Sequence, residues 1–423
     1  MALETAMRRI KSLLGLEQGR VGLDRVVELA HRHLGLEVVF VAEVSADTWA
    51  CRAVAGDAAS FNVTLGEGIP ADATYSQLLT AGELANLIPD TSAVPRLAQL
   101  PWTRKAGIGA FIGVPLQLSD GTLYGTLCGM DHNPDHTLGE RDVRFMTMLA
   151  ELMVFDLDEQ RRLERLSVNF WNLIETDNVD IACQPIIDLG TGDCLGVEAL
   201  ARFPAPFGSP DQTFADAEDV GLGLEIERLA IREAWKLLPR LRPEQFLALN
   251  VSPSALLELA GRAQKRDDLP LGSLVVEITE QSVVHSYADL RNAVAPLRQN
   301  GLRLAIDDAG AGYASLHHIV ELRPDFIKVD RSLVDGVADD HARRVAVSAF
   351  VLLSLDLGAM VVAEGVESPR DLAAVCDLGV HAAQGYLLGR PSTNRDDLTR
   401  WTEGPPRQMR GAPRRVHRQP SPG

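Results

Sequence analysis

The chain has 423 residues, which is enough for two or three domains of about 100–200 residues each. Hydrophobic residues make up 46% and charged residues 23%, an ordinary globular composition with enough apolar side chains for a sizeable core. The formal net charge of −17 argues against a general binder of nucleic-acid polymers, because such a protein would carry a basic surface. A small charged ligand held by specific groups remains compatible with this charge.

The spacing of the cysteines and the length of the apolar stretches indicate the cellular compartment of the protein. The five cysteines are widely spaced and form no C-x-x-C pair, which is a poor disulfide framework and a poor zinc site. The N-terminus has no signal-peptide h-region, and the longest apolar stretch, residues 345–355, is too short for the ~20 residues that a membrane span needs. We therefore expect a cytoplasmic protein with no transmembrane segment.

The first part of the chain predicts a compact α+β domain over residues 19–160. Apolar residues recur at helical spacing over 23–34, and strand-like runs cover 37–44 and 48–56. Two further runs, 111–118 and 123–131, are joined by Ser-Asp-Gly-Thr, which is typical of a hairpin turn. A long helix is expected from about 138 to 175.

That helix is the natural domain boundary, and we assign residues 161–175 as a connecting helix. Leu163, Leu166, Phe170 and Leu173 are spaced 3-4-3, which is heptad-like, but they cover fewer than the three or four heptads of a convincing coiled coil. Two interpretations stay open. The segment is either a last helix of one domain packed on the next, or a helix that carries a signal between domains.

The second part of the chain predicts a (β/α)8 barrel over residues 176–400. Eight short β-branched runs alternate with helical segments from Ile181 onward. The first two runs are separated by a short Gly-Thr-Gly turn, so we expect a hairpin and a modified TIM-like barrel with one antiparallel strand. Residues 404–423 are rich in Pro and Arg with little apolar content, which predicts a disordered basic tail.

Polar side chains follow almost every predicted barrel strand. Barrel enzymes keep their active sites at the carboxyl ends of the strands, so these residues are expected to converge on one rim. They are Glu198, Asn250, Glu277, Glu280, Asp307, Asp308, Lys328, Asp330, Glu364, Glu367 and Gln384.

Clustered carboxylates repel one another, and divalent cations would compensate their charge. A set of carboxylates and an amide, without His or Cys, favours Mg²⁺ or Mn²⁺ over zinc. Adjacent Asp307 and Asp308 can serve two ions about 3.5–4 Å apart, an arrangement used in phosphodiester hydrolysis. Lys328, one of five lysines, could orient the attacking water. Alternatively, its amine could form a Schiff base with a carbonyl substrate. Arg202 is either solvated or grips a phosphate.

The same residues carry a family resemblance. The stretch QPIIDLGTGDCLGVEALARF, residues 184–203, resembles the opening of an EAL domain, with Glu198-Ala199-Leu200 as the signature triplet. NVSPSAL, EITE, DDAGAGYASL, IKVDRSLV, VVAEGVES and QGYLLGRP resemble that family's later motifs, in order. The resemblance covers about residues 173–397.

The resemblance implies a cyclic-di-GMP phosphodiesterase that opens the ring to linear pGpG with two Mg²⁺ or Mn²⁺ ions, and a homodimer formed through the barrel. Lys328 would hold the water, Glu364 could accept its proton, and Asp308 would share the second metal. Glu280 would brace the loop after the Asp pair. The implied metal ligands are Glu198, Asn250, Glu277, Asp307, Asp308 and Glu364. The implied substrate contacts are Gln184, Leu200, Arg202, Asp330, Glu367 and Gln384.

Three positions depart from the family pattern without removing a ligand. Ala309 stands where Phe is usual, Ala314 where Ser is common, and Cys183 where Tyr is common. Ala309 falls in the regulatory loop and is the one feature that favours the rival hypothesis, a non-catalytic effector that binds cyclic-di-GMP and signals through protein partners.

Residues 19–160 resemble a GAF domain, a sensor of small ligands, and would regulate the barrel. Cys51 and Cys128 could anchor a chromophore, but packed thiols are favoured. Histidines could ligate a metal, but packed or solvated roles are favoured here too. These histidines are His31, His33, His132 and His136. No sensor ligand is predicted.

Overall fold

The computed structural model describes residues 22–45, 48–70, 74–263, 270–279, 284–312 and 315–404. Glu280, Ala314 and nearly all of the predicted tail lie outside these residues. The chain divides into two compact units, Met1–Arg165 and Leu166–Gly423, which meet inside the long helix α6 (Glu140–Thr176). Among the described helices, none is long and apolar enough to cross a membrane.

The first unit contains a six-stranded antiparallel sheet in the order β3-β2-β1-β6-β5-β4. The four strands predicted from the sequence are confirmed as β1 (Val38–Val44), β2 (Thr48–Gly56), β5 (Ala110–Gln117) and β6 (Leu123–Asp131). The edge strands β3 (Gly68–Pro70) and β4 (Leu87–Ile88) were not predicted, because two or three residues are too few to show a period.

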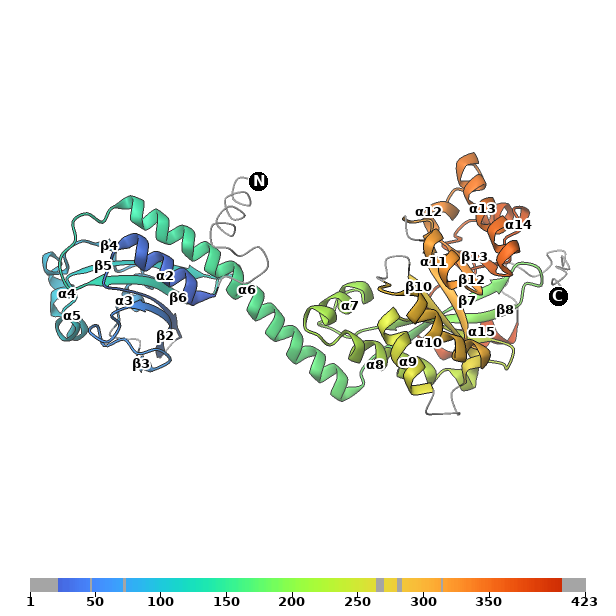
Figure 1. Cartoon of the computed structure of the whole chain (residues 1–423), viewed down its shortest axis with the longest axis horizontal. Coiled ribbons are helices and arrows are strands. Elements are labelled where there is room, and N and C mark those ends of the chain that lie inside the picture. Colours follow the sequence, from blue (N-terminus) through green and yellow to red (C-terminus); the bar gives the residue numbers. More distant parts are fainter. Residues whose placement is uncertain are drawn as a thin grey trace. The chain divides into compact units, whose positions relative to one another are not determined.

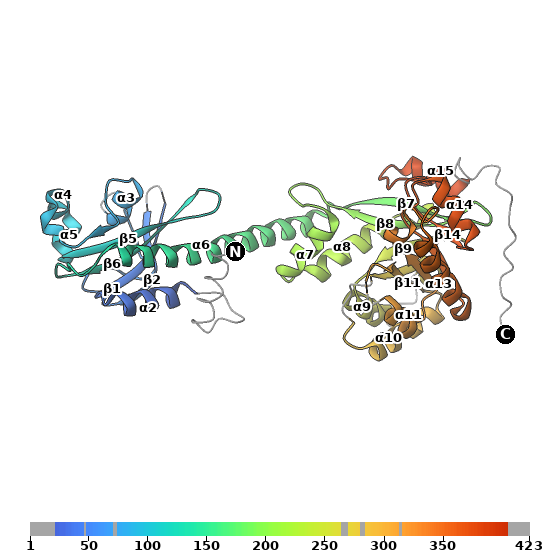
Figure 2. The same cartoon turned by 90° about the horizontal axis from the view of Figure 1, so that it is seen from above.

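Helices cover both faces of this sheet (Figures 1 and 2). On one face, α2 (Leu23–Leu34) and the first half of α6 bury apolar residues such as Val26, Ala30 and Met146. On the other face, a largely aromatic core includes Trp49 and Tyr75. It is covered by α3 (Tyr75–Thr80), η2 (Thr91–Ala93), α4 (Pro95–Gln99) and α5 (Pro101–Ala106). The α+β expectation is confirmed.

Eight strands of the second unit close into a barrel. They are β7 (Asp180–Asp188), β8 (Cys194–Arg202), β9 (Phe246–Asn250), β10 (Leu274–Thr279), β11 (Arg303–Ala309), β12 (Phe326–Val329), β13 (Met360–Ala363) and β14 (Ala382–Ala383). Strand β7 runs antiparallel to both of its neighbours, β8 and β14, and the other neighbours are parallel. The modified barrel with one antiparallel strand is therefore confirmed.

Helices pack around the outside of the barrel (Figure 1). Several begin at a Ser, Asp or Asn whose side chain accepts a hydrogen bond from an N–H of the first turn, as at Ser209, Ser286 and Asp340. The helices are α7 (Pro210–Asp219), α8 (Gly223–Trp235), η3 (Leu238–Arg240), α9 (Pro253–Ala263), η4 (Leu271–Ser273), α10 (Tyr287–Gln299), α11 (Ser315–Leu322), α12 (Arg331–Val334), α13 (His341–Leu357), α14 (Pro369–Asp377) and α15 (Arg395–Glu403).

The barrel interior has an apolar floor and a polar rim. Side chains alternate between the two faces of a strand, so residues two apart point into the same space. In β12, Phe326 belongs to an apolar cluster with Val275 of β10 and Ala305 of β11. Two residues further along each strand, the same face presents Lys328, Glu277 and Asp307. The floor is apolar apart from Arg303 of β11, whose guanidinium lies over the rings of Phe246 and Phe326, and the clustered acids lie at the carboxyl ends.

The second half of α6 belongs to the barrel unit. Phe170 and Leu173 are buried in the barrel core, and Leu166 packs against that core. The ring of Phe170 lies 4.8 Å from that of Phe207. The 3-4-3 spacing therefore marks a helix packed on the barrel, which supports the first of the two interpretations.

Phe170→Ala should destabilise the barrel unit by about 3–5 kcal/mol, because it removes a fully buried ring and leaves a cavity. The matched control is Trp171→Ala, one position along the same helix, where the side chain is 51% exposed. Urea unfolding of both variants measures the difference. Equal losses would contradict the assignment of this helix face to the barrel core.

Candidate functional site

The ammonium group of Lys328 lies among four carboxylates at the polar rim. Its Nζ is 2.8 Å from Oε1 of Glu364, 2.9 Å from Oδ1 of Asp307, 3.0 Å from Oε2 of Glu277 and 3.6 Å from Oε2 of Glu198. The lysine side chain is 2% exposed, and the most exposed of these carboxylate side chains, that of Glu364, is 16% exposed. Four acids thus share one buried cation.

Burial and mutual repulsion govern the protonation of this cluster. Burial raises the pKa of Glu277 and Glu364 well above the ordinary value, with repulsion from neighbouring carboxylates adding to it. Burial alone would lower the pKa of Lys328, but the four carboxylates outweigh it and raise the pKa. Burial also works against the charge of Glu198, yet Lys328 and two amides hold its pKa below the ordinary value. The cluster is short of positive charge.

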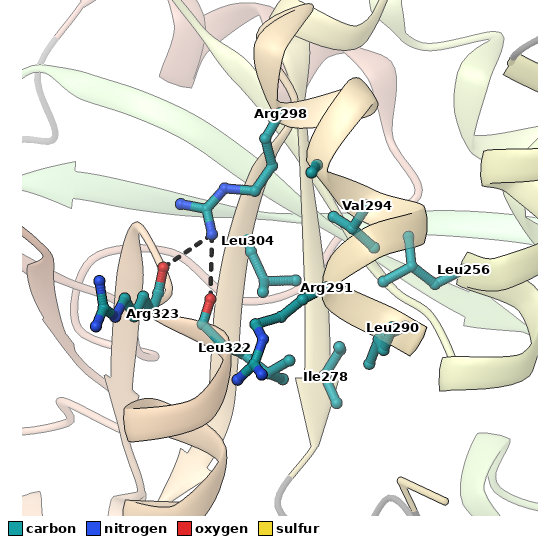
Figure 3. Close-up of a pocket in the computed structure, with 10 residues that line it drawn as sticks. Leu256, Ile278, Leu290, Arg291, Val294, Arg298, Leu304, Leu322 and Arg323 are labelled. Carbon is teal, nitrogen blue, oxygen red and sulfur yellow. Dashed lines mark hydrogen bonds between the residues drawn. The ribbon is translucent and has the colours of Figure 1, made fainter. Parts of the chain in front are cut away.

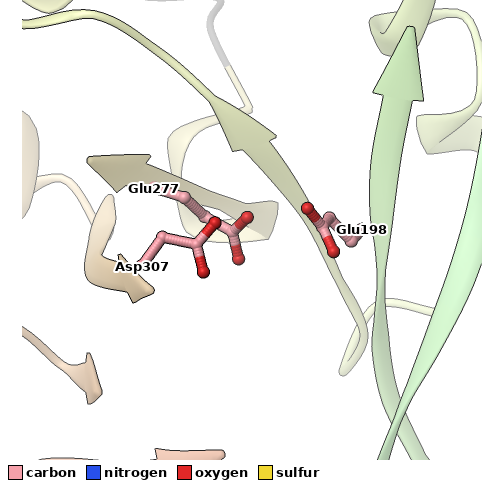
Figure 4. Close-up of side chains that lie close together, drawn as sticks. All are labelled: Glu198, Glu277 and Asp307. Atoms are coloured by element: carbon pink, nitrogen blue, oxygen red, sulfur yellow. The ribbon is translucent and has the colours of Figure 1, made fainter. Parts of the chain in front are cut away.

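The acids form two groups that share Asp307. Glu198, Glu277 and Asp307 can bring one oxygen each to within 4.8 Å of one another, and so can Asp307, Asp308 and Glu364. Figure 4 shows the first group, contributed by three different strands. This is the convergence that the strand-end pattern predicted.

A backbone irregularity brings the adjacent Asp307 and Asp308 into one cluster, although consecutive residues of a regular strand point to opposite faces. Asp308 has a left-handed backbone (φ 54°), and the pairing register of β11 with β12 shifts between Ile306 and Ala309. The N–H of Asp308 donates to Oδ1 of Asp307 at 3.1 Å. A residue type that tolerates positive φ is therefore required here.

Three amides surround Glu198. Nδ2 of Asn250 donates to its Oε1 at 2.9 Å, and Nε2 of Gln384 donates to its Oε2 at 2.6 Å. The same Nε2 lies 2.9 Å from Oε1 of Gln184, whose own Nε2 donates to the carbonyl of Gly389. Within the described residues, Oε1 of the buried Gln384 accepts no hydrogen bond.

The donor set fits hard divalent cations. The first group offers carboxylate oxygens from three strands, with the amide of Asn250 beside them, and the second offers them from β11 and from the residue after β13; neither contains His or Cys. A divalent ion would supply the positive charge that this buried cluster lacks.

A cavity of about 450 Å³ adjoins the cluster and is lined by Leu200, Arg202, Asn250 and Glu277. Four of the residues predicted from the sequence thus line one space. The guanidinium of Arg202 donates to the carbonyl of Ala201 at 2.8 Å.

Sequence reasoning missed Glu227, which lines the same cavity from α8. Its carboxylate accepts from the N–H of Ser252 at 2.9 Å and from the hydroxyl of Ser252 at 2.7 Å. Burial raises its pKa. Glu227 belongs to an amphipathic helix rather than a strand end, so its sequence pattern is that of an ordinary surface acid.

A second cavity, of about 210 Å³, has an apolar lining and contains none of the clustered acids. Figure 3 shows Ile278, Leu290 and Leu304 around it, with Arg298 donating to the carbonyls of Leu322 and Arg323 at 3.1 and 2.9 Å. It lies on the outer faces of β10 and β11, which the helices cover, and it offers no metal ligands.

Two predicted substrate contacts have structural partners. Oδ1 of Asp330 accepts from the N–H of Ser332 at 2.9 Å and caps α12, and Glu367 pairs with Arg331 at 3.1 Å. Their contact with substrate stays a prediction, as does the bracing role of Glu280, which lies outside the described residues. Ala309 is fully buried at the end of β11.

The cysteines singled out in the first unit are buried and unreactive in character. Burial raises the pKa of Cys51 to about 11 and that of Cys128 to about 12. The ring of His33 packs on Phe145, and that of His132 packs on Phe61. Among the described residues, both groups of three potential metal ligands lie in the barrel. These observations favour packed roles for Cys51 and Cys128, whereas His33 and His136 are exposed to solvent.

Comparison with known proteins identifies both units. The model of the EAL domain matches residues 164–391, more than half of the chain. The chain belongs to the EAL domain family. Residues 2–157 match the model of the GAF domain. Both resemblances predicted from the sequence are confirmed.

Among curated relatives, the EAL protein is 33% identical over 219 residues to a cyclic di-GMP phosphodiesterase of Pseudomonas aeruginosa, covering 49% of this chain and 37% of that one. It is 28% identical over 297 residues to the cyclic di-GMP phosphodiesterase NbdA of the same organism, covering 67% of this chain and 37% of that one. The chain therefore spans little more than a third of the length of these relatives.

Among solved structures, an EAL domain protein of Listeria monocytogenes has a TM-score of 0.50 and 24% identity, over 56% of this chain and 98% of that one. At this identity the comparison supports the barrel fold alone.

Thiol labelling with iodoacetamide at pH 8 should leave Cys51 and Cys128 unmodified in the folded protein, because both are buried and almost wholly protonated there. Cys376 is half-buried and serves as the internal control that should react first. Mass spectrometry of the labelled peptides gives the answer. Fast labelling of Cys128 would contradict its packed role and would support the alternative hypothesis that it anchors a chromophore.

Proposed function

We propose that this EAL protein hydrolyses cyclic-di-GMP to linear pGpG with two divalent cations, Mg²⁺ or Mn²⁺. The observation that carries the proposal is Asp307, which belongs to both groups of carboxylates and can bridge two ions. The curated relatives described above are named as phosphodiesterases of this dinucleotide. The cations reconcile a buried acidic cluster with an anionic substrate.

Each side chain has a role in this proposal. Glu198, Asn250, Glu277 and Asp307 hold one ion, and Asp307, Asp308 and Glu364 hold the other. Two ions supply an activated water and stabilise charge on the attacked phosphate. Lys328 orients that water through its ammonium group, which already lies 2.8 Å from Glu364. Glu364, which lies beside this ammonium, would accept the proton of the water.

The substrate would lie in the cavity beside the cluster. Leu200 offers an apolar contact and Arg202 a cation there, at the edge of the acidic rim. The free Oε1 of Gln384 accepts a hydrogen bond, and Gln184 fixes the orientation of that amide. Asp330 and Glu367 complete the proposed contacts from the loops after β12 and β13.

The rival function is a non-catalytic effector that binds cyclic-di-GMP and signals through protein partners. Ala309 favours it, since a small buried residue replaces the family's Phe next to the Asp pair. The complete set of carboxylates favours the enzyme.

Regulation of the barrel by the GAF domain would run through α6. This one helix contributes Met146 and Met153 to the core of the first unit, and Phe170 and Leu173 to the core of the second. A shift of the first half of α6 would therefore displace the residues of its second half, which pack on the barrel. The cytoplasmic location expected from the sequence stays a prediction.

A homodimer would form through the barrel. Helix α13 exposes Val345, Leu352 and Leu355, with exposed fractions of 55%, 65% and 65%. Their spacing of seven and three places them on one helical face. Apolar side chains gathered on one surface are typical of an interface between proteins.

Glu198→Gln should lower the hydrolysis of cyclic-di-GMP by about 100-fold or more, because it removes one charge from the ligand set while keeping the shape of the side chain. Glu225→Gln, an exposed substitution on α8, is the control and should keep full activity. Chromatography of the reaction mixture measures the release of pGpG by each variant and so tests the prediction. Wild-type protein that binds cyclic-di-GMP with Mg²⁺ or Mn²⁺ present but never cleaves it would support the effector instead.

Removal of residues 1–160 should change the rate of hydrolysis, because the helix that packs on the barrel loses its connection to the first unit. The comparison of kcat and KM between the truncated and the full chain measures this effect. Identical constants, with the barrel folded by circular dichroism, would argue against regulation by the GAF domain.

Leu352→Glu should shift the protein from dimer to monomer, because a buried charge at the interface is costly. Leu257→Glu on α9, also an exposed leucine, is the matched control. Sedimentation velocity measures both. A monomeric wild type, or a Leu352→Glu variant that stays dimeric, would contradict an interface at α13.

A further inference from the structure

Arg331 contacts the loop that follows Glu364. Nη2 of Arg331 lies 3.1 Å from Oε1 of Glu367, three residues beyond Glu364. The same arginine also contacts the loop between these two acids, at Gly365. Its side chain therefore spans residues 365–367 directly after a proposed metal ligand.

The contact at Gly365 is made by the arginine's methylene groups. A Cβ at this glycine would lie 2.4 Å from Cγ and 2.9 Å from Cδ of Arg331, closer than side chains approach one another. Gly365 also has a φ of 64°, which favours glycine. The arginine stem thus lies directly on the loop backbone.

Backbone hydrogen bonds also hold this loop to the barrel. The N–H of Glu364 donates to the carbonyl of Val329 at 3.0 Å, and the N–H of Val366 donates to the carbonyl of Gln384 at 3.0 Å. These bonds hold the residues on both sides of Gly365. The stem of Arg331 restricts the glycine itself, the one residue between them with wide conformational freedom.

Arg331 is itself held in place. It is the first residue of α12, and the carboxylate of Asp330 caps this helix through the N–H of Ser332. It follows Lys328 by three residues. One short segment therefore supplies the lysine of the acidic cluster and the arginine outside the neighbouring loop.

We propose that Arg331 is a positioning residue that fixes the carboxylate of Glu364 for metal binding by clamping residues 365–367. The inference rests on the proposed function, because it takes Glu364 as a metal ligand. Residues that orient ligands from outside commonly affect metal affinity by about 10- to 100-fold.

The alternative is an exposed ion pair without consequence. Arg331 and Glu367 are 55% and 40% exposed, and pairs of this kind contribute little to the stability of a protein. A clamp and an idle pair therefore predict similar thermal unfolding, and they differ in metal affinity.

The experiment measures Mn²⁺ affinity by calorimetry on the full chain, and thermal unfolding without metal. Arg331→Ala should weaken Mn²⁺ binding about tenfold and leave the unfolding midpoint nearly unchanged. Arg370→Ala, which removes a more exposed ion pair with Asp339, is the control and should change neither. Mn²⁺ affinity of Arg331→Ala equal to that of the control would overturn the clamp.

Arg331→Met keeps an apolar stem over Gly365 and loses the ion pair, so it should weaken Mn²⁺ binding less than Arg331→Ala does. If Arg331→Ala fails to fold, Arg331→Met takes its place in the test. A Mn²⁺ affinity of Arg331→Met equal to that of the wild type would then overturn the proposal. Gly365→Ala should weaken Mn²⁺ binding strongly in the wild-type background. The loss of Mn²⁺ affinity should be smaller in the Arg331→Ala background, because the arginine stem is absent there. Strictly additive effects would contradict the stem contact.

Hydrolysis measured in parallel separates this inference from the function on which it rests. Wild-type protein that binds Mn²⁺ but leaves cyclic-di-GMP intact would overturn the phosphodiesterase and leave the clamp standing. Normal hydrolysis with Mn²⁺ affinity unchanged in Arg331→Ala would overturn the clamp alone. Wild-type protein that binds no Mn²⁺ would overturn both.

Discussion

The ion cluster around Lys328 is the constraint on which the barrel depends. One ammonium faces four carboxylates, all at least four-fifths buried, at distances of 2.8–3.6 Å. Buried charges of one sign are costly unless they are paired, so the acids can lie at this rim only because a lysine stands among them. The remaining deficit of positive charge is also what makes the rim suited to divalent cations.

The strands satisfy this constraint by separating polar from apolar residues along their length. The floor packs apolar side chains, with Phe246 and Phe326 in ring contact at 5.2 Å and the guanidinium of Arg303 over both rings. The residues of the acidic cluster lie two positions further along their strands, toward the carboxyl ends and on the same faces. Stability and chemistry occupy different layers of one barrel, which is why strands of four to seven residues can provide both.

Two residues with positive φ lie beside the proposed metal ligands. Asp308 breaks the alternation of β11 so that two adjacent acids serve one cluster, and Gly365 turns the chain directly after Glu364. Neither position gains stability from this geometry, since positive φ is unfavourable for most residues. Both are held by neighbours, Asp308 by its bond to Asp307 and Gly365 by Arg331.

The strand periods and the strand-end acids were readable from the sequence because both are local. Eight β-branched runs, the hairpin of β7 and β8, and the convergence of Glu198, Glu277 and Asp307 follow from alternation and from the geometry of a closed parallel sheet. The short strands β3 and β4 carried no period. Glu227 and Arg331 looked like ordinary charged residues of helices, because their partners Ser252 and Gly365 are distant in sequence.

By itself, then, the sequence determined which residues face the barrel interior and which type of metal they suit, since side-chain chemistry and a period of two need no tertiary contact. Only the tertiary structure decided that the second half of α6 packs on the barrel and that Cys51 and Cys128 are buried. These facts depend on contacts between segments far apart in the chain, and no local pattern encodes the distance between them.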